Sequence, residues 1–159
     1  MRRQDRQVTD NEQIRHILDS AKIVHLGMVD GGRPYIVPLN YGYTYEAGRL
    51  TLYMHGAMEG RKNDVLRADP HVFIEIETDT ALLEGTDIPC DYSEFYACIM
   101  GDGEATIVTD PAEKAEGLKQ LMKQQTGREF AISEQMCKMV QVYKVVVEEV
   151  SAKCHPASK

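Results

Sequence analysis

The feature that most constrains the fold is a tight turn between two strand-like segments. Residues 22–29 and 34–43 are rich in β-branched and aromatic side chains, and Asp30-Gly31-Gly32-Arg33 between them has the chemistry of a short hairpin turn. A third strand-like segment, 49–54, follows another turn at Glu46-Ala47-Gly48. Such short connections cannot carry the chain across a sheet to a parallel neighbour, so we predict an antiparallel sheet.

Helical periodicity interrupts these strands. A capping-box pattern with Thr9 as N-cap opens a helix that runs to about Ala21, with apolar residues three and four positions apart. Asp110 and Pro111 supply the N-cap and first-turn proline of a second helix. Shorter helices are predicted over 59–68 and 133–139, and further strands over 71–77, 95–108 and 142–150. Short antiparallel strands with helices at intervals are typical of an α+β fold, and here they favour a small barrel.

Three places interrupt the regular pattern. Pro38 stands inside the second strand, where it cannot donate a ladder hydrogen bond, so a bulge or an unpaired edge is expected there. Residues 79–94, with Gly85, Pro89 and several acidic side chains, are typical of a loop. Residues 154–159 are predicted to form a frayed tail.

Composition bounds the classes of function. A chain of 159 residues has the usual size of one domain, so a single domain over 1–159 is expected. The net charge of −7 argues against binding to nucleic acid or to anionic membranes. No apolar run reaches the ~18 residues of a membrane helix and no secretory signal is evident, so we expect a cytoplasmic protein. The four cysteines and five histidines show no metal-ligand spacing, and no metal site is expected.

The segment Tyr53–Asp64 carries the strongest functional signal. It leads from an apolar strand through Gly56 and Gly60 into a short helix that begins with Arg61 and Lys62. Glycines let the main chain approach an anion, free N–H groups at a helix start point toward it, and a cation adds a charge-assisted contact. The segment lacks the spacing of a P-loop. The residues alone leave two interpretations open, a phosphate site or a simple strand-to-helix turn.

The order of these motifs resembles a known family. The segments Pro-Tyr-Ile-Val-Pro-Leu-Asn-Tyr (34–41), Leu-Tyr-Met-His-Gly-Ala-Met-Glu-Gly-Arg-Lys-Asn-Asp (52–64) and Leu-Arg-Ala-Asp-Pro (66–70) are similar to those of pyridoxamine 5′-phosphate oxidase-like flavin-binding split barrels, in particular the nitroimidazole-resistance (Nim-type) branch. The resemblance implies a six-stranded antiparallel split β-barrel with peripheral helices. It also implies a homodimer with FMN, or FAD in some members, bound at the interface.

The resemblance also implies which residues hold the flavin. The cofactor-binding residues would be Val37, Pro38, Leu39, Asn40 and Tyr41 along the isoalloxazine ring, Met54, His55, Gly56 and Ala57 beside the ribityl chain and ring, and Lys62 with Arg61 as helper at the phosphate. His55 would also be the catalytic residue, because a histidine can donate or accept a proton near neutral pH. The chain has no tryptophan, whereas true pyridoxamine-phosphate oxidases carry a tryptophan-containing C-terminal segment, so oxidation of vitamin B6 is not expected.

Two functions of different class remain open at this stage. The first is a flavin-dependent, nitroreductase-like oxidoreductase that passes electrons from an external donor to a nitroaromatic or other small electron-poor acceptor. The second is a flavin carrier or sensor without turnover, since the sequence holds no separate nicotinamide-binding fingerprint. A purely structural dimer would leave the arrangement of Gly56, Gly60 and Lys62 unexplained.

Overall fold

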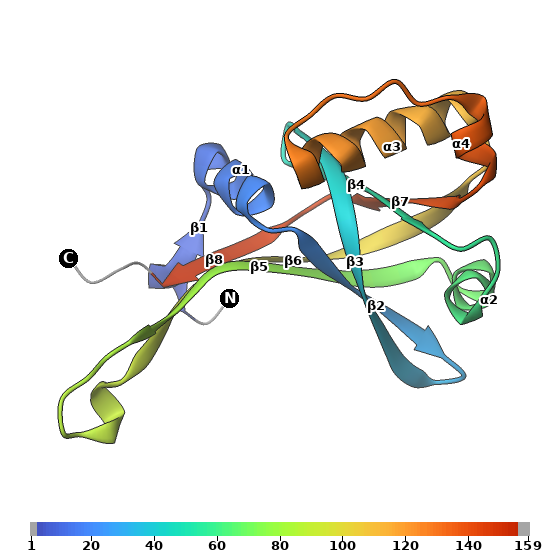
Figure 1. Cartoon of the computed structure of the whole chain (residues 1–159). Helices are drawn as coiled ribbons and strands as arrows, with labels where there is room; N and C mark the ends of the chain where they lie inside the picture. The colour runs from blue at the N-terminus through green and yellow to red at the C-terminus, as the bar shows by residue number, and fades with distance from the viewer. Residues whose placement is uncertain (1–2, 156–159) are drawn as a thin grey trace.

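The framework is one antiparallel sheet that closes on itself (Figure 1). The computed structural model describes residues 3–155. Its strands run in the order β1-β8-β6-β5-β2-β3-β4-β7, and β7 also pairs with β6, so strands β2 to β7 form a six-membered ring. The strands are β1 (Gln7–Val8), β2 (Ile23–Asp30), β3 (Arg33–Glu46), β4 (Arg49–Gly56), β5 (His71–Leu83), β6 (Ser93–Val108), β7 (Gln141–Val147) and β8 (Ser151–His155). The predicted α+β class and six-stranded split barrel are confirmed.

Alternation along each strand fills the barrel. Leu26, Leu52, Ile74, Ile99 and Val145 point inward from five different strands and are completely buried. Their neighbours in sequence face outward, as the two-residue side-chain period of a strand requires. The interior is therefore a packed apolar core rather than a channel.

The predicted hairpin of β2 and β3 is confirmed, and its turn explains the two glycines. Asp30 pairs with Arg33, while Gly31 and Gly32 have φ values of 55° and 78°. Positive φ at both central positions matches the right-handed twist of the flanking strands and favours glycine. Pro38 pairs with His25 in unbroken register, so the expected bulge is wrong.

The other half of that expectation, an unpaired edge, is confirmed. Residues 33–40 of β3 pair with β2, whereas residues 41–46 of the same strand pair with β4. The first half of β3 therefore has a strand neighbour on one side only. A proline is tolerated there because the main chain on the free side has no ladder hydrogen bond to lose.

Two helices pack against the barrel through short contacts. In α1 (Asn11–Ser20) the side chains of Ile14, Ile17 and Leu18 join the core, and the N-cap is Asp10, not the predicted Thr9. Asp10 is the N-cap because its carboxylate accepts a hydrogen bond from the Gln13 N–H in the first turn, at 2.9 Å.

Helix α3 (Pro111–Thr126) lies across β3 and β4 (Figure 1). A Cβ atom on Gly42 would lie only 2.1 Å from the Leu121 nitrogen, and one on Gly117 would lie 2.6 Å from the Tyr53 ring. The N-cap of α3 is Asp110, as predicted. The remaining helices are η1 (Gln4–Arg6), α2 (Arg61–Ala68), η2 (Pro89–Asp91) and α4 (Glu134–Lys138).

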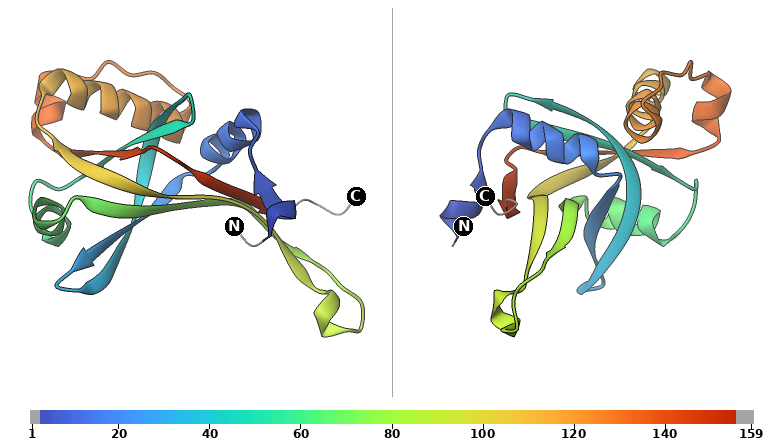
Figure 2. Two further views of the ribbon diagram at one scale, coloured as in Figure 1. Left: turned by 180° about the vertical axis from the view of Figure 1, so that it is seen from behind. Right: turned by 60° about the vertical axis from the view of Figure 1, so that its left-hand side comes forward.

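A hairpin arm projects from the barrel where a loop was predicted. Strands β5 and β6 stay paired past a register shift between Thr78 and Ala81, and η2 lies at the tip. Figure 2 shows from two further sides how this arm leaves the body of the molecule. The loop prediction for 79–94 is wrong at both ends, because Ala81–Leu83 and Ser93–Phe95 form a ladder, but residues 84–92 contain no strand and form a loop around η2.

The C-terminal prediction needs a similar correction. The strand predicted over 142–150 ends at Val147. Ser151–His155 form β8, which pairs with β6, so residues 154 and 155 are not a frayed tail, while residues 156–159 lie outside the described part of the chain. Within residues 3–155, no helix combines the length and apolar content required to cross a membrane.

Candidate functional site

The candidate site is the junction where β4 passes into α2. Gly60 is the N-cap of the helix, with φ of 133° and no side chain to satisfy the first helical N–H groups. The Gly60 carbonyl accepts hydrogen bonds from the N–H groups of Asn63 at 2.9 Å and Asp64 at 3.4 Å, which tightens the first turn. The start of α2 therefore presents unsatisfied N–H donors, the arrangement that binds anions at helix N-termini.

Lys62 brings a positive charge to this junction. Its ammonium nitrogen lies 4.5 Å from the centroid of the Tyr143 ring, and it occupies the space next to Gly56, 2.8 Å from where a Cβ atom would stand. The side chain is half-buried, and burial lowers the pKa of its amine. No carboxylate within residues 3–155 lies within ion-pair distance of Lys62. A partly desolvated cation without a counter-ion favours an anionic ligand.

A buried polar pair holds this arrangement in place. The Tyr143 hydroxyl donates to Oδ1 of Asn63 at 2.5 Å, and Nδ2 of Asn63 donates to the carbonyl of Ala57 at 3.2 Å. Asn63 is only 1 % exposed, so both bonds are made away from water. Burial raises the pKa of the Tyr143 hydroxyl, which keeps it a donor. The pair connects β7, α2 and the 57–60 loop.

Arg61 faces a different direction from Lys62. Its Nε lies 2.7 Å from a carboxylate oxygen of Asp30, and its guanidinium stacks 4.2 Å above the Tyr35 ring. Neighbouring helix positions are about 100° apart, so only one of two consecutive cations can face a given anion. Arg61 fastens α2 to the β2–β3 hairpin, and its proposed help at the phosphate remains a prediction.

His55 lies at the other end of the junction. It is exposed on the outer side of β4 and pairs with Val142 of β7 in the ladder. Its ring can therefore meet a solvent-borne molecule. The next residues, Gly56 and Ala57, connect it directly to the Lys62 site. The structure brings together His55, Gly56, Ala57 and Lys62 of the predicted site.

The β3 side of the predicted site divides into two groups. Val37 and Leu39 are partly buried against the core, and Pro38 is exposed. Asn40 is exposed too, but its Nδ2 donates to the carbonyl of Lys22 at 3.1 Å and to Oε1 of Gln125 at 3.0 Å. Asn40 is thus already engaged with α3 and the start of β2, rather than pointing freely toward a ligand.

Two predicted contact residues have side chains in the core. Tyr41 is completely buried and donates its hydroxyl hydrogen to the Leu18 carbonyl at 2.7 Å, and Met54 is 1 % exposed. From these two residues only main-chain atoms can contact a cofactor. Tyr41 pairs with Met54. On the far side of this pair from the β3–β4 turn, β3 pairs only with β2, and β4 pairs only with β7. The two predicted halves of the site, 37–40 and 55–57, therefore begin at one point and diverge from it.

Sequence reasoning missed Tyr143 and Asn63. Tyr143 gives no local signal, because 80 residues separate it from the asparagine it binds. Asn63 did offer one, since an asparagine just after a helix start often bonds a nearby main-chain group.

The geometry agrees with the comparison to protein families. The model for the pyridoxamine 5′-phosphate oxidase family matches residues 10–154, nearly the whole chain. The chain belongs to this family. No curated protein matches the sequence.

Several solved structures resemble the chain over most of its length. A provisionally assigned 5-nitroimidazole antibiotic resistance protein from Bacteroides thetaiotaomicron is 30 % identical, with 93 % of this chain and 86 % of that chain covered and a TM-score of 0.77. The flavocytochrome Anf3 from Azotobacter vinelandii is 21 % identical over 99 % and 72 % of the two chains, with a TM-score of 0.77. A FAD-binding protein from Mesorhizobium loti is 19 % identical over 95 % and 98 %, with a TM-score of 0.63. The last two show the fold alone.

Proposed function

We propose that this family member binds a flavin nucleotide, FMN in the first instance, and acts as an oxidoreductase. The observation that carries the proposal is the half-buried ammonium of Lys62, which has no counter-ion within residues 3–155 and stands beside the uncapped start of α2. A phosphate ester supplies the missing negative charge and accepts the free N–H groups. The names of two related structures, a flavocytochrome and a FAD-binding protein, support a flavin as the rest of the ligand.

The residues present fit such a group. Because Gly56 has no side chain, the Lys62 ammonium can lie directly against the main chain there, so an anion bound at this point would be close to both the ammonium and main-chain N–H groups. Val37 and Leu39 offer apolar surface that is only partly covered in one chain. When bound, a flavin supplies the electron-transfer chemistry, and the protein holds and orients it.

The chain's own contribution to turnover is assigned to His55. Its imidazole is exposed and lies two residues before the Ala57 carbonyl that Asn63 holds, so it is positioned next to the proposed binding loop. An imidazole can give a proton to an acceptor that receives electrons, because its charge changes near neutral pH. The related 5-nitroimidazole resistance protein supports a nitroaromatic or another small electron-poor molecule as the acceptor.

The half-covered surface of β3 supports one further part of the proposal. A cofactor that lies along residues 37–40 would stay exposed on one side in a single chain. A second copy, related by twofold symmetry, would cover that side, and we propose a homodimer with the flavin between the two copies.

The direct test is the visible absorbance spectrum of the purified protein, followed by titration of the flavin-free form with FMN while flavin fluorescence is recorded. The proposal expects a yellow protein or saturable quenching; a colourless protein that quenches nothing refutes it. Anaerobic addition of NADH or NADPH then separates the two candidate classes. Rapid bleaching supports the oxidoreductase. If the yellow colour persists with NADH or NADPH but dithionite still reduces the flavin, the carrier is supported. The lack of a nicotinamide-binding fingerprint in the sequence is the observation in favour of this second candidate.

A further inference from the structure

Lys62 differs from most other lysines of the chain in its partners. Within residues 3–155, four lysine ammonium groups are bound to main-chain carbonyls or to a carboxylate: Lys22, Lys114, Lys119 and Lys144. The Lys62 ammonium has neither kind of partner in that part of the chain and lies against Gly56 and the face of the Tyr143 ring. Burial there lowers the pKa of the amine, so at any pH a larger share of it is uncharged than in an exposed lysine. An uncharged lysine amine is a nucleophile.

The carboxylates closest to Lys62 in the fold do not hold it in its charged form. Asp30 and Asp64 each bind an arginine of α2, at 2.7 and 3.3 Å. Glu59, in the loop before the helix, is exposed and forms no ion pair within residues 3–155. No negative charge therefore compensates the loss of hydration at the Lys62 amine, and burial is the cause of its lowered pKa.

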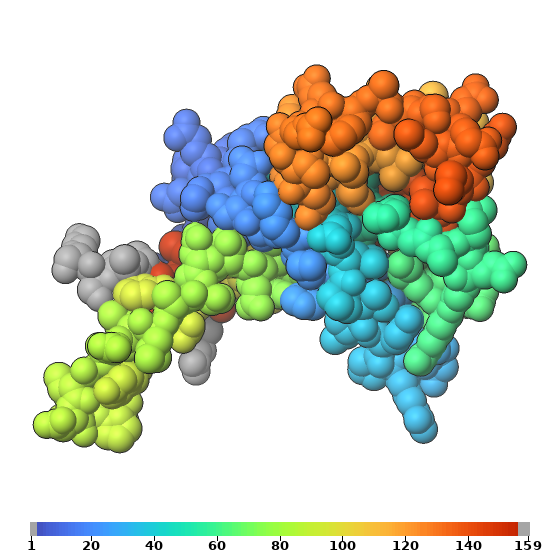
Figure 3. All heavy atoms as spheres, in the orientation of Figure 1, coloured from blue at the N-terminus to red at the C-terminus, as the bar shows by residue number. Residues whose placement is uncertain are grey.

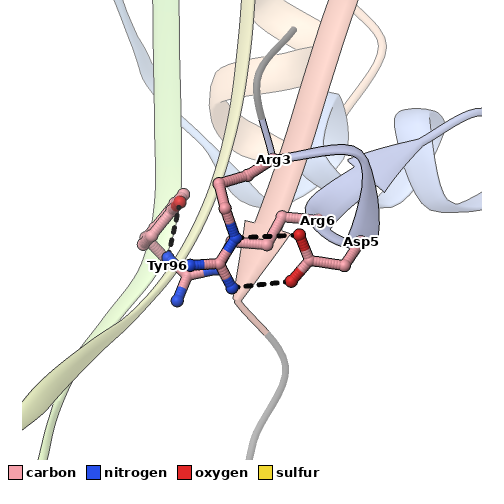
Figure 4. Close-up of polar contacts among 4 residues, drawn as sticks. All are labelled: Arg3, Asp5, Arg6 and Tyr96. Atoms are coloured by element: carbon pink, nitrogen blue, oxygen red, sulfur yellow. Dashed lines mark hydrogen bonds and ion pairs between the residues drawn. The ribbon is translucent and has the colours of Figure 1, made fainter.

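A second basic cluster lies where the N-terminal segment meets β6, but its chemistry is different. Figure 4 shows Arg3 bound to both carboxylate oxygens of Asp5, at 2.8 and 2.6 Å, and Arg6 donating to the Tyr96 hydroxyl at 3.3 Å. A guanidinium keeps its proton in proteins, so neither arginine can act as a nucleophile. Lys62 is thus the better candidate for covalent chemistry.

Main-chain donors for a phosphate group stand beside this amine. The N–H groups of Arg61 and Lys62 are the first of α2, and neither has an acceptor within residues 3–155. Such donors can hold a phosphate group even when the lysine is uncharged. The loop before α2 is exposed, and Figure 3 shows this region at the surface of the molecule, in green on the right. A small phosphorylated molecule can therefore reach both the donors and the amine.

We propose that Lys62 is a site of acetylation by acetyl phosphate, and that this modification regulates the anion site. The phosphate group binds to the free N–H groups of α2, and the acetyl carbon lies two bonds from its phosphorus atom, within reach of the lysine. The amine nitrogen attacks that carbon, the N–C bond forms, the C–O bond to phosphate breaks, and one amine proton leaves with hydrogenphosphate. The same N–H groups stabilise the departing negative charge. The inference rests on the anion site of the proposed function, but not on the flavin.

The modification removes the property that attracts the ligand. Acetylation takes away the positive charge of the lysine, so a phosphate ester loses its charge-assisted partner while the N–H groups remain. FMN affinity should fall about ten- to hundred-fold. A bound phosphate ester in turn covers the N–H groups that hold acetyl phosphate. Occupied protein should therefore resist acetylation, and acetylated protein should resist loading.

The first test compares initial rates of acetylation at single lysines, measured by mass spectrometry of peptides after flavin-free protein is incubated with acetyl phosphate. Lys62 should react about tenfold faster or more than Lys138, an exposed lysine of α4, because the reagent is bound beside it. Added inorganic phosphate should slow the reaction at Lys62 only. Acetic anhydride, which carries no phosphate, should show a smaller preference that phosphate does not change. Equal rates at the two lysines, or a Lys62 rate that phosphate leaves unchanged, overturns the proposal.

A second test connects the modification with binding. Acetylated wild type and Lys62→Gln should both bind FMN about ten- to hundred-fold more weakly than untreated protein. Lys62→Arg keeps the charge and cannot be acetylated there, so treatment with acetyl phosphate should leave its FMN affinity unchanged. A loss in treated Lys62→Arg assigns the effect to other lysines and overturns the proposed regulation. Fast, phosphate-sensitive acetylation of a protein that binds no flavin refutes the proposed cofactor alone, whereas flavin binding with slow acetylation refutes the modification alone.

Discussion

Replacing Lys62 by methionine should separate phosphate recognition from every other part of flavin binding. Methionine keeps most of the side-chain length and removes the charge. Charge-assisted hydrogen bonds contribute about 1.5–3 kcal/mol, so the variant should bind FMN about ten- to hundred-fold more weakly. The effect should fall in the upper part of this range because Lys62 is partly desolvated and has no competing carboxylate within residues 3–155.

Riboflavin, which lacks the phosphate, completes the comparison. Fluorescence-quenching titrations of both proteins with FMN and riboflavin form a cycle in which the loss should appear for FMN only. Lys138→Met, which removes an exposed lysine on α4, is the matched control and should bind both ligands like the wild type. Equal losses for FMN and riboflavin, or no loss for either, would show that Lys62 does not meet the phosphate.

Thermal unfolding of Lys62→Met tests whether weaker FMN binding results from a less stable fold. Removing the Lys62 charge relieves the cost of burying it but also removes its contact with the Tyr143 ring, which contributes roughly 0.5–1 kcal/mol. These effects oppose one another, so the stability of the flavin-free variant should change by less than about 1 kcal/mol. A large fall in melting temperature would instead point to a structural role for the ammonium.

Four other outcomes are expected. FMN affinity, titrated at stepped pH, should fall as pH rises through the lowered pKa of Lys62 in the flavin-free protein, because the phosphate binds the charged amine. In Lys62→Arg the fall should occur at higher pH, because a guanidinium keeps its charge. Tyr143→Phe leaves buried Asn63 without its donor and should cost about 1–3 kcal/mol in urea unfolding. Gly42→Ala forces a methyl group into the main chain of α3 and should cost about 3 kcal/mol in the same assay. His55→Gln should keep bound flavin but reduce acceptor turnover roughly 10²- to 10⁴-fold in steady-state kinetics.

The divergence of β3 and β4 explains why one chain alone would offer only half of the proposed flavin site. The two strands pair with each other as far as Tyr41 and Met54 and then separate, as β3 continues beside β2 and β4 continues beside β7. Residues 37–40 and 55–57 therefore lie on either side of a gap between β3 and β4 in the barrel. One margin of this gap carries the proposed anion site at the start of α2, and the other carries the apolar side chains of Val37 and Leu39. A second chain placed there would bury the ligand and the open β3 flank together, so cofactor binding and pairing would be thermodynamically linked.

Much of the framework could be predicted from local chemistry. The Asp30–Arg33 turn, the N-cap at Asp110 and the alternation in β5 each depend on residues close in sequence, and each is confirmed. The loop predicted from Gly85 and Pro89 is present over 84–92, but the two flanking segments were mistaken for part of it, because they are held as strands by pairing with each other across the hairpin. Composition alone cannot distinguish a disordered acidic loop from a paired acidic ribbon.

The candidate site shows the same boundary between local and long-range information. Gly56, Gly60 and Lys62 lie within seven residues of one another, and their chemistry could be interpreted directly. Tyr143 could not, because it reaches Lys62 only through the register in which β7 lies beside β4 and Met54 pairs with Tyr143. That register also places the hydroxyl at Asn63. The group that holds the cation is therefore a product of strand pairing, and no motif near the glycines encodes it.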